Sequence, residues 1–159
     1  MNNRTFLRNE FTNSVEFYNI NQNIINWNYN EVIGEGFYQK YTDNFAFVKI
    51  KISKNEKKDS HEFINNLTDE EMPIEFSNEI IKALNFFISY LHGIKGERIN
   101  LKIELIDGTY HVVDSRTKDF QIATFQAICN CFNKGLRQIS ESEKKMIEIC
   151  KLRNKNNYS

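Results

Sequence analysis

Residues 99–135 read INLKIELIDGTYHVVDSRTKDFQIATFQAICNCFNKG, and this stretch decides the fold. Its first part alternates between apolar and polar residues, which predicts a strand with one buried and one solvated face. The dipeptide Asp107-Gly108 is typical of a type I′ turn, in which both central residues need positive φ. A long apolar segment follows and predicts a deeply buried helix. We therefore expect a strand, a tight turn, a short return strand and a helix, in that order.

A two-residue turn would fix the register of this hairpin. Ile106 would pair with Thr109, and Glu104 would pair with His111. This register places His111 and Glu104 together on the solvent face beside the turn. The pair could act as an acid–base couple, but no nucleophile or oxyanion donor accompanies it. We therefore expect His111 to serve binding rather than catalysis.

Two regular elements are predicted upstream of this stretch. A helix is expected to begin at Pro73, because the missing N–H of a proline would have no intrahelical partner in the first turn. Apolar residues then recur at helical spacing until Gly93, which is expected to end the helix as a left-handed cap. Residues 45–52 predict a strand. Its buried face would consist of Ala46, Val48, Ile50 and Ile52.

The first third of the chain is less regular. Residues 11–17 alternate between apolar and polar side chains, so we expect a half-buried strand there and an N-terminal strand extension over residues 1–23. Residues 27–41 are aromatic and β-prone. They are interrupted by Gly34 and Gly36, which usually indicates a bulge or a bend.

The last part of the chain predicts one more helix. Ser140 and Glu143 match a capping box, in which each side chain accepts the backbone N–H of the other residue. The helix is expected to run to about Leu152. Residues 136–159 would then form a C-terminal helix and tail.

Composition excludes several classes of protein. The 159 residues fit a single domain over 1–159, and 40% hydrophobic residues are ample for a folded core. The 21 basic and 21 acidic residues give a formal charge of zero, which argues against tight, charge-driven binding to free nucleic acid. No run of about eighteen apolar residues occurs, and the start MNNRTFLRNEF lacks the apolar core of a signal peptide. We therefore expect neither membrane insertion nor secretion.

Sequence motifs for cofactor or metal chemistry are missing. Gly34 and Gly36 are not followed by the Gly-Lys-Ser/Thr of a phosphate-binding loop. The three histidines lie far apart in sequence and lack the spacing of a helical metal site. Cys129, Cys131 and Cys150 are odd in number and lie in helical-looking sequence, which favours a reducing, cytoplasmic environment. We expect no cofactor, no metal and no enzymatic activity.

Residues 103–123, IELIDGTYHVVDSRTKDFQIA, resemble domain IV of translation elongation factor G, where an apolar strand, the segment D-G-S-Y-H-D-V-D-S-S and a helix opening with F-x-I-A follow one another. Residues 73–94, PIEFSNEIIKALNFFISYLHGI, resemble the family's I-P-x-E-F…A-V-x-x-G-I helix. Residues 27–33, WNYNEVI, are similar to its V-A-Y-R-E-T-I strand. The resemblance covers a core of roughly residues 24–135.

This resemblance implies an α+β fold: a two-layer sandwich with a mixed, mostly antiparallel sheet and two helices on one face, as in the second domain of a small-subunit ribosomal protein. In elongation factor G this domain mimics the anticodon arm of tRNA and reaches the decoding centre, with the histidine of the D-G-S-Y-H segment at its tip. Carried over by position, the tip here would comprise two loops. They consist of Gln39, Lys40, Tyr41, Thr42, Asp43 and Asn44, and of Asp107, Gly108, Thr109, Tyr110 and His111.

The resemblance further implies a stand-alone, non-enzymatic binding module without a GTPase domain. Its expected partner is small-subunit ribosomal RNA or a translation factor, contacted weakly and in a salt-sensitive way. The cations expected to meet phosphates are Lys40, Lys49, Lys51 and Arg116. The alternative is a protein-interaction module, regulatory or toxin-neutralising, that keeps the fold without ribosome binding. This alternative includes a homodimer formed through Phe45 and Phe47, which lie opposite the predicted core face of their strand.

Overall fold

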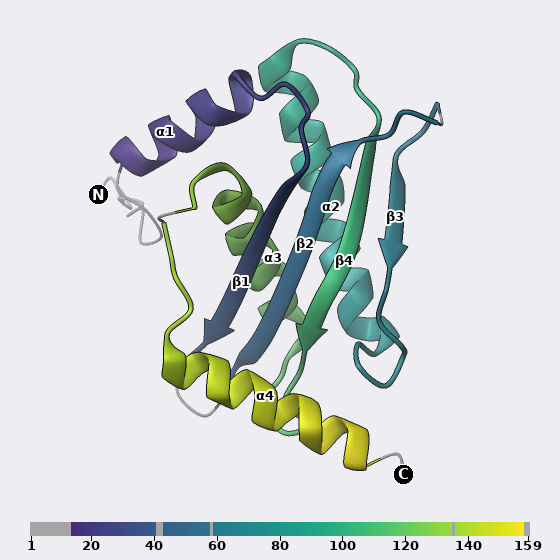
Figure 1. Ribbon diagram of the computed structural model, residues 1–159, viewed down its shortest axis with the longest axis vertical. Coiled ribbons are helices and arrows are strands. Elements are labelled where there is room, and N and C mark those ends of the chain that lie inside the picture. The colour runs from purple at the N-terminus through teal and green to yellow at the C-terminus, as the bar shows by residue number, and fades with distance from the viewer. Residues whose placement is uncertain (1–13, 41–42, 58, 135, 158–159) are drawn as a thin grey trace, which may run out of the picture.

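The computed structural model describes residues 14–40, 43–57, 59–134 and 136–157 (Figure 1). Its elements are α1 (Ser14–Ile25), β1 (Val32–Gln39), β2 (Phe45–Lys54), β3 (Glu62–Asn65), α2 (Ile74–Lys95), β4 (Leu101–Thr109), α3 (Thr117–Phe132) and α4 (Glu141–Asn156). The strands form one sheet in the order β1-β2-β4-β3. β2 is antiparallel to β1 and β4, whereas β3 is parallel to β4. The predicted α+β fold with a mixed, mostly antiparallel sheet is confirmed.

The main core lies between the sheet and the two helices α2 and α3, which cover the same face (Figure 1). The four residues predicted for the buried face of β2 are fully buried there, as their alternation indicated. They meet Phe76, Ile80 and Leu84 of α2 and Phe120 and Ala127 of α3 in one apolar cluster. None of the helices in the described ranges is long and apolar enough to cross a membrane.

The opposite face of the sheet is partly covered by α4, which lies across the sheet at one end (Figure 1). Ile147 and Cys150 of α4 pack on Phe37, Phe45 and Phe47 in a second apolar cluster. The expectation of an exposed dimer surface at Phe45 and Phe47 is therefore wrong, because the chain's own last helix buries both rings. Helix α4 begins as predicted, but it continues past the predicted end at about Leu152 to Asn156.

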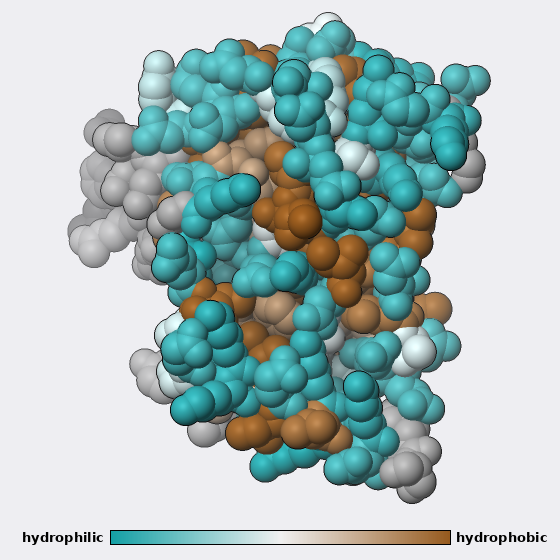
Figure 2. Space-filling model, in the orientation of Figure 1, coloured by the Kyte–Doolittle hydropathy of each residue, from teal (hydrophilic) through white to brown (hydrophobic). Residues whose placement is uncertain are grey.

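The predicted capping box sets the start of α4. Ser140 Oγ accepts the N–H of Glu143 at 3.2 Å, and Glu143 Oε2 accepts the N–H of Ser140 at 2.8 Å. Beyond α4, the outer face of the sheet is polar, with ion pairs from Lys49 to Glu35 and from Lys51 to Glu104. Figure 2 shows this side of the molecule, where hydrophilic residues cover most of the surface around a smaller hydrophobic area.

Gly34 and Gly36 do not mark a bulge, because β1 pairs with β2 in uninterrupted register. Instead, the two glycines allow α3 to approach β1 closely. A Cβ at Gly34 would lie 2.0 Å from the carbonyl oxygen of Ala127, and a Cβ at Gly36 would lie 1.7 Å from that of Ala123. Only a residue without a side chain fits between strand and helix at these distances.

The outer edge of β1 is closed by side chains rather than by another strand. Gln126 Oε1 accepts the N–H of Phe37 at 3.2 Å, and Asn130 Nδ2 donates to the carbonyl of Glu35 at 2.5 Å. The guanidinium of Arg137 donates to the carbonyl of Phe37. These three side chains satisfy backbone groups that would otherwise face solvent.

The predicted hairpin at Asp107-Gly108 is wrong, because β4 continues through both residues to Thr109. Lys49 lies opposite Asp107 and Ile50 opposite Leu105, so Ile106 is an extra residue at a bulge. Gly108 does not form a turn; its lack of a side chain allows close packing instead. A Cβ there would lie 2.7 Å from Met72 Cε and 3.0 Å from the carbonyl oxygen of Phe47.

The C-terminal end of α2 differs from its predicted end. The helix continues past Gly93 to Lys95, and Gly96 provides the left-handed cap with a φ of 66°. The extra turn places Lys95 against α1, where its ammonium donates to the carbonyls of Ile24 at 3.2 Å and Ile25 at 2.8 Å. This contact satisfies carbonyls at the end of α1.

Part of the predicted strand over residues 11–17 is also wrong. Residues 11–13 lie outside the described residues, but from Ser14 onward the chain forms α1. Ile20 and Ile24, four residues apart, are buried in the main core. This helical spacing outweighs the short alternation that suggested a strand.

The end of the sheet opposite α4 contains two neighbouring histidines, His61 and His92. His61 Nδ1 accepts the N–H of Leu101 at 3.1 Å, and its ring lies 5.3 Å from the ring of His92. Burial, with smaller contributions from the charges of His92 and Arg98, lowers the pKa of His61. Between this lowered pKa and the ordinary value near 6.5, the unfolded chain binds more protons than the folded chain.

We therefore expect stability to fall as the pH drops below about 6.5, with no contribution from His61 above it. The substitution His61→Asn removes this titration and should flatten the dependence. Urea unfolding of both proteins at pH 7.5 and pH 5.5 measures the difference. Equal losses of stability in the two proteins would contradict the assignment to His61.

Candidate functional site

The structure brings the two predicted tip loops to the same end of the sheet (Figure 1). The first loop joins the end of β1 to the start of β2, and the end of β4 lies beside Phe47 of β2. Tyr41 and Thr42 of the first loop lie outside the described residues. Gln39 is the last residue of β1, and Lys40 and Asp43 follow it. A role of these residues in binding stays a prediction.

Asp119 joins the first loop to α3. One carboxylate oxygen accepts from the side-chain amide of Asn44 at 2.8 Å, and the other accepts the N–H groups of Phe45 at 3.2 Å and Arg116 at 2.9 Å. The residue is 1% exposed. Sequence reasoning missed Asp119, although an acidic residue three positions into a helix is a known capping signal.

His111 is fixed by its neighbours in sequence rather than by Glu104. Its N–H donates to Ser115 Oγ at 2.8 Å, and this hydroxyl donates to the carbonyl of Phe45 at 2.5 Å. Its Nδ1 accepts the N–H groups of Asp114 at 3.1 Å and Val113 at 3.3 Å. Because Nδ1 uses its lone pair in this way, the neutral ring carries its proton on Nε2.

The predicted pairing of Glu104 with His111 is wrong because the hairpin that required it does not form. Glu104 pairs instead with Lys51 at 2.8 Å and with Lys102 at 3.4 Å on the outer face of the sheet. The hydrogen bond from Lys51 is the main cause of the lowered pKa of Glu104, with Lys102 contributing and burial opposing it. Glu104 therefore belongs to a structural ion-pair network.

Four of the described tip residues are in contact with α4, and the first is Gln39, whose side-chain amide donates to Met146 Sδ at 3.1 Å. The ammonium of Lys151 lies 2.7 Å from Asp107 Oδ2. The amide of Asn154, which is buried, donates to Thr109 Oγ1 at 3.2 Å and to the carbonyl of Tyr110 at 3.0 Å. Burial would lower the pKa of Lys151, but the hydrogen bond and charge of Asp107, assisted by Glu148, outweigh it and raise the pKa.

The exposed part of the second loop lies one step further along the chain than predicted. Gly108, Thr109 and Tyr110 are buried, whereas Val112 is 61% and Val113 82% exposed. Sequence reasoning missed these valines. Their exposure could have been inferred from the sequence. Two adjacent valines point to opposite faces of a strand, so both cannot be buried on the same face.

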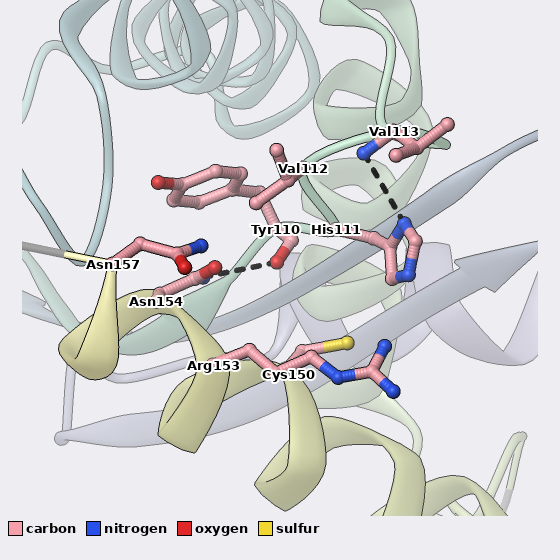
Figure 3. A pocket seen from close by; sticks show the side chains of 8 residues that line it. All are labelled: Tyr110, His111, Val112, Val113, Cys150, Arg153, Asn154 and Asn157. Carbon is pink, nitrogen blue, oxygen red and sulfur yellow. Dashed lines mark hydrogen bonds between the residues drawn. The ribbon is translucent and has the colours of Figure 1, made fainter.

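A cavity of about 170 Å³ lies between this loop and α4 (Figure 3). Its walls are residues 110–113 on one side and Cys150, Arg153, Asn154 and Asn157 on the other. Within the described parts of the chain, no group of three or more His, Cys, Asp and Glu side chains could hold a metal ion.

The fold and these loops define an α+β sandwich domain that presents two loops at one end of its sheet. The family model described as "Elongation factor G, domain IV" matches residues 28–135, and the chain belongs to this family. An Elongation factor G from Rhodopseudomonas palustris (strain BisB18) is 33% identical over 94 residues, which cover 59% of this chain and 14% of the relative. The chain thus corresponds to a small part of that protein.

A solved structure shows the same fold. The crystal structure of a protein from Thermus thermophilus matches with a TM-score of 0.53 and 21% identity, over 65% of this chain and 16% of the other. Helix α4 lies beyond the residues that the family model matches. Its contacts with the tip are therefore a feature of this chain that the family match does not include.

Proposed function

We propose that the chain is a non-enzymatic binding module that contacts ribosomal RNA or a translation factor through its tip. Family membership supports the proposal, because the matched region includes both tip loops. The buried carboxylate of Asp119 fixes Asn44 and Phe45, and Ser115 links His111 to Phe45. Residues that are fixed before binding lose less conformational freedom when a partner is bound.

The charges available at the tip favour weak binding. Of the four cations expected to meet phosphates, Lys49 and Lys51 are paired with carboxylates on the outer sheet face. Lys40 and Arg116 are exposed near the tip, together with Lys118. Two or three phosphate contacts give an affinity that falls markedly between about 50 and 200 mM salt.

Co-sedimentation with ribosomes at these two salt concentrations tests the proposal. We expect the wild type to sediment at low salt and to dissociate largely at moderate salt. The double variant Lys40→Ala, His111→Ala should stay in the supernatant. The matched control Lys57→Ala removes an exposed lysine at the opposite end of the sheet and should behave as the wild type. A wild type that stays in the supernatant at both concentrations overturns the proposal.

The second candidate function is a protein-interaction module, and an apolar groove away from the tip favours it. The groove, of about 190 Å³, lies between α1, α2 and α3. At its rim the rings of Phe86 and Phe125 meet edge to face at 5.8 Å, while Phe86 stays 65% exposed. The variant Phe86→Ser separates the candidates, because binding through the tip leaves its co-sedimentation with ribosomes unchanged.

A further inference from the structure

The cavity beside His111 has walls from two segments far apart in sequence. Residues 110–113 follow β4, and the last two turns of α4 form the facing wall (Figure 3). Asn154 links the two walls through its hydrogen bonds to Thr109 and Tyr110. Cys150, which also lines the cavity, is buried. The cavity is therefore built by tertiary contacts, and α4 is part of it.

Two side chains present nitrogen donors to this cavity. His111 uses Nδ1 as an acceptor for backbone N–H groups, so Nε2 carries the proton. The guanidinium of Arg153 forms no hydrogen bond or ion pair with the residues that the structure describes. Figure 3 shows this guanidinium extending toward the side of the cavity on which the His111 ring lies. The imidazole N–H of His111 and the guanidinium of Arg153 together favour an anionic ligand.

Arg153 supplies the positive charge at the cavity. Residues 149–157 contain three basic residues and no acidic residue. Lys151 is paired with Asp107, and Lys155 lines other pockets beside Glu71, which leaves Arg153 at this cavity. Its full charge exceeds the roughly half negative charge of a helix C-terminus. The carboxylate of Asp114 lies 3.2 Å from Nδ1 of His111, and its charge also acts on Cys150.

Cys150 adds no negative charge, because burial raises the pKa of its thiol and keeps it neutral at pH 7. Arginine and an imidazole N–H are suited to phosphate oxygens, which accept charge-assisted hydrogen bonds in fixed directions. The exposed side chains of Val112 and Val113 border the same cavity and offer an apolar surface to a sugar or base.

We propose that this cavity binds a backbone phosphate of RNA between His111 Nε2 and the Arg153 guanidinium. The inference rests on the proposed function and names its ligand at the tip. It also gives α4 a direct role in binding, because Arg153 comes from a helix outside the region matched by the family model.

NMR spectroscopy of the full chain tests this site. We expect a short single-stranded RNA oligonucleotide to shift the His111 ring signals and the Arg153 Nε–H signal. The substitution Arg153→Ala should weaken this binding about tenfold, the usual effect of one charge-assisted bond. Arg153→Lys keeps the charge without the planar fork and should lose affinity to a smaller extent. Lys145→Ala, an exposed lysine of α4 outside the cavity, is the control and should bind as the wild type.

Each outcome decides one claim. Unchanged RNA affinity in Arg153→Ala, with an unchanged circular dichroism spectrum, overturns the site even when the wild type sediments with ribosomes. RNA-induced shifts that depend on Arg153, in a protein that does not sediment with ribosomes, support the site and overturn the proposed ribosome contact. Shifts with inorganic phosphate but not with RNA overturn the assignment to a nucleic-acid backbone.

Discussion

The substitution Gly36→Ala should lower the free energy of unfolding by about 3 kcal/mol or more, at the upper end of single-residue effects. The added Cβ would lie 1.7 Å from the carbonyl oxygen and 2.7 Å from the carbonyl carbon of Ala123. Both atoms belong to the backbone of α3, so no side-chain rotation can relieve the overlap. The strand and the helix must move apart, and the core between them loses packing.

Gly93→Ala is the matched control, because a Cβ there meets no atom within 4 Å and the residue lies inside α2. Alanine is a better helix former than glycine, so this variant should gain about 0.5–1 kcal/mol. Urea unfolding followed by circular dichroism measures both changes. A loss below about 1 kcal/mol for Gly36→Ala would show that α3 does not pack this closely on β1.

The substitution Asp119→Ala should cost about 3 kcal/mol, because it removes an ionised acceptor from a buried position. The N–H groups of Phe45 and Arg116 and the amide of Asn44 would lose their acceptor. Phe45 is itself buried, so solvent cannot easily replace the carboxylate at its N–H. The same change should loosen the first tip loop and the start of α3 together.

Asp119→Asn keeps one acceptor oxygen and should lose less stability than Asp119→Ala. Asp69→Ala removes an exposed carboxylate in the turn before α2 and should change stability by less than about 0.5 kcal/mol. Thermal and urea unfolding of the three variants give the ranking. Equal losses in Asp119→Ala and Asp69→Ala would refute the role given to the buried carboxylate.

The elements that sequence predicts well are those whose periodicity reflects burial on a single face. The four inward residues of β2 and the helix after Pro73 are examples. The Asp107-Gly108 dipeptide led to the wrong prediction of a hairpin turn, because the same two residues also suit a tightly packed strand. The packing of Met72 and Phe47 against Gly108 decides between them, and this packing is a tertiary property.

In the candidate site, too, local sequence predicts some features and tertiary packing decides the others. The resemblance placed His111 in the second tip loop, and in the structure this residue follows the end of β4. It could not indicate that Asn154 and Lys151 reach the same segment, because the position of α4 depends on how Ile147 and Cys150 pack on the sheet. Local sequence contains no record of this packing.

The side chains along the outer edge of β1 have a consequence for association. Exposed sheet edges recruit extended segments of other chains, which leads to strand addition and aggregation. Here Gln126, Asn130 and Arg137 occupy the hydrogen-bonding positions that an incoming strand would need. The opposite edge strand, β3, has four residues and offers a short template. Partners of this domain should therefore bind through side chains and loops, and fibril growth from its sheet should be slow.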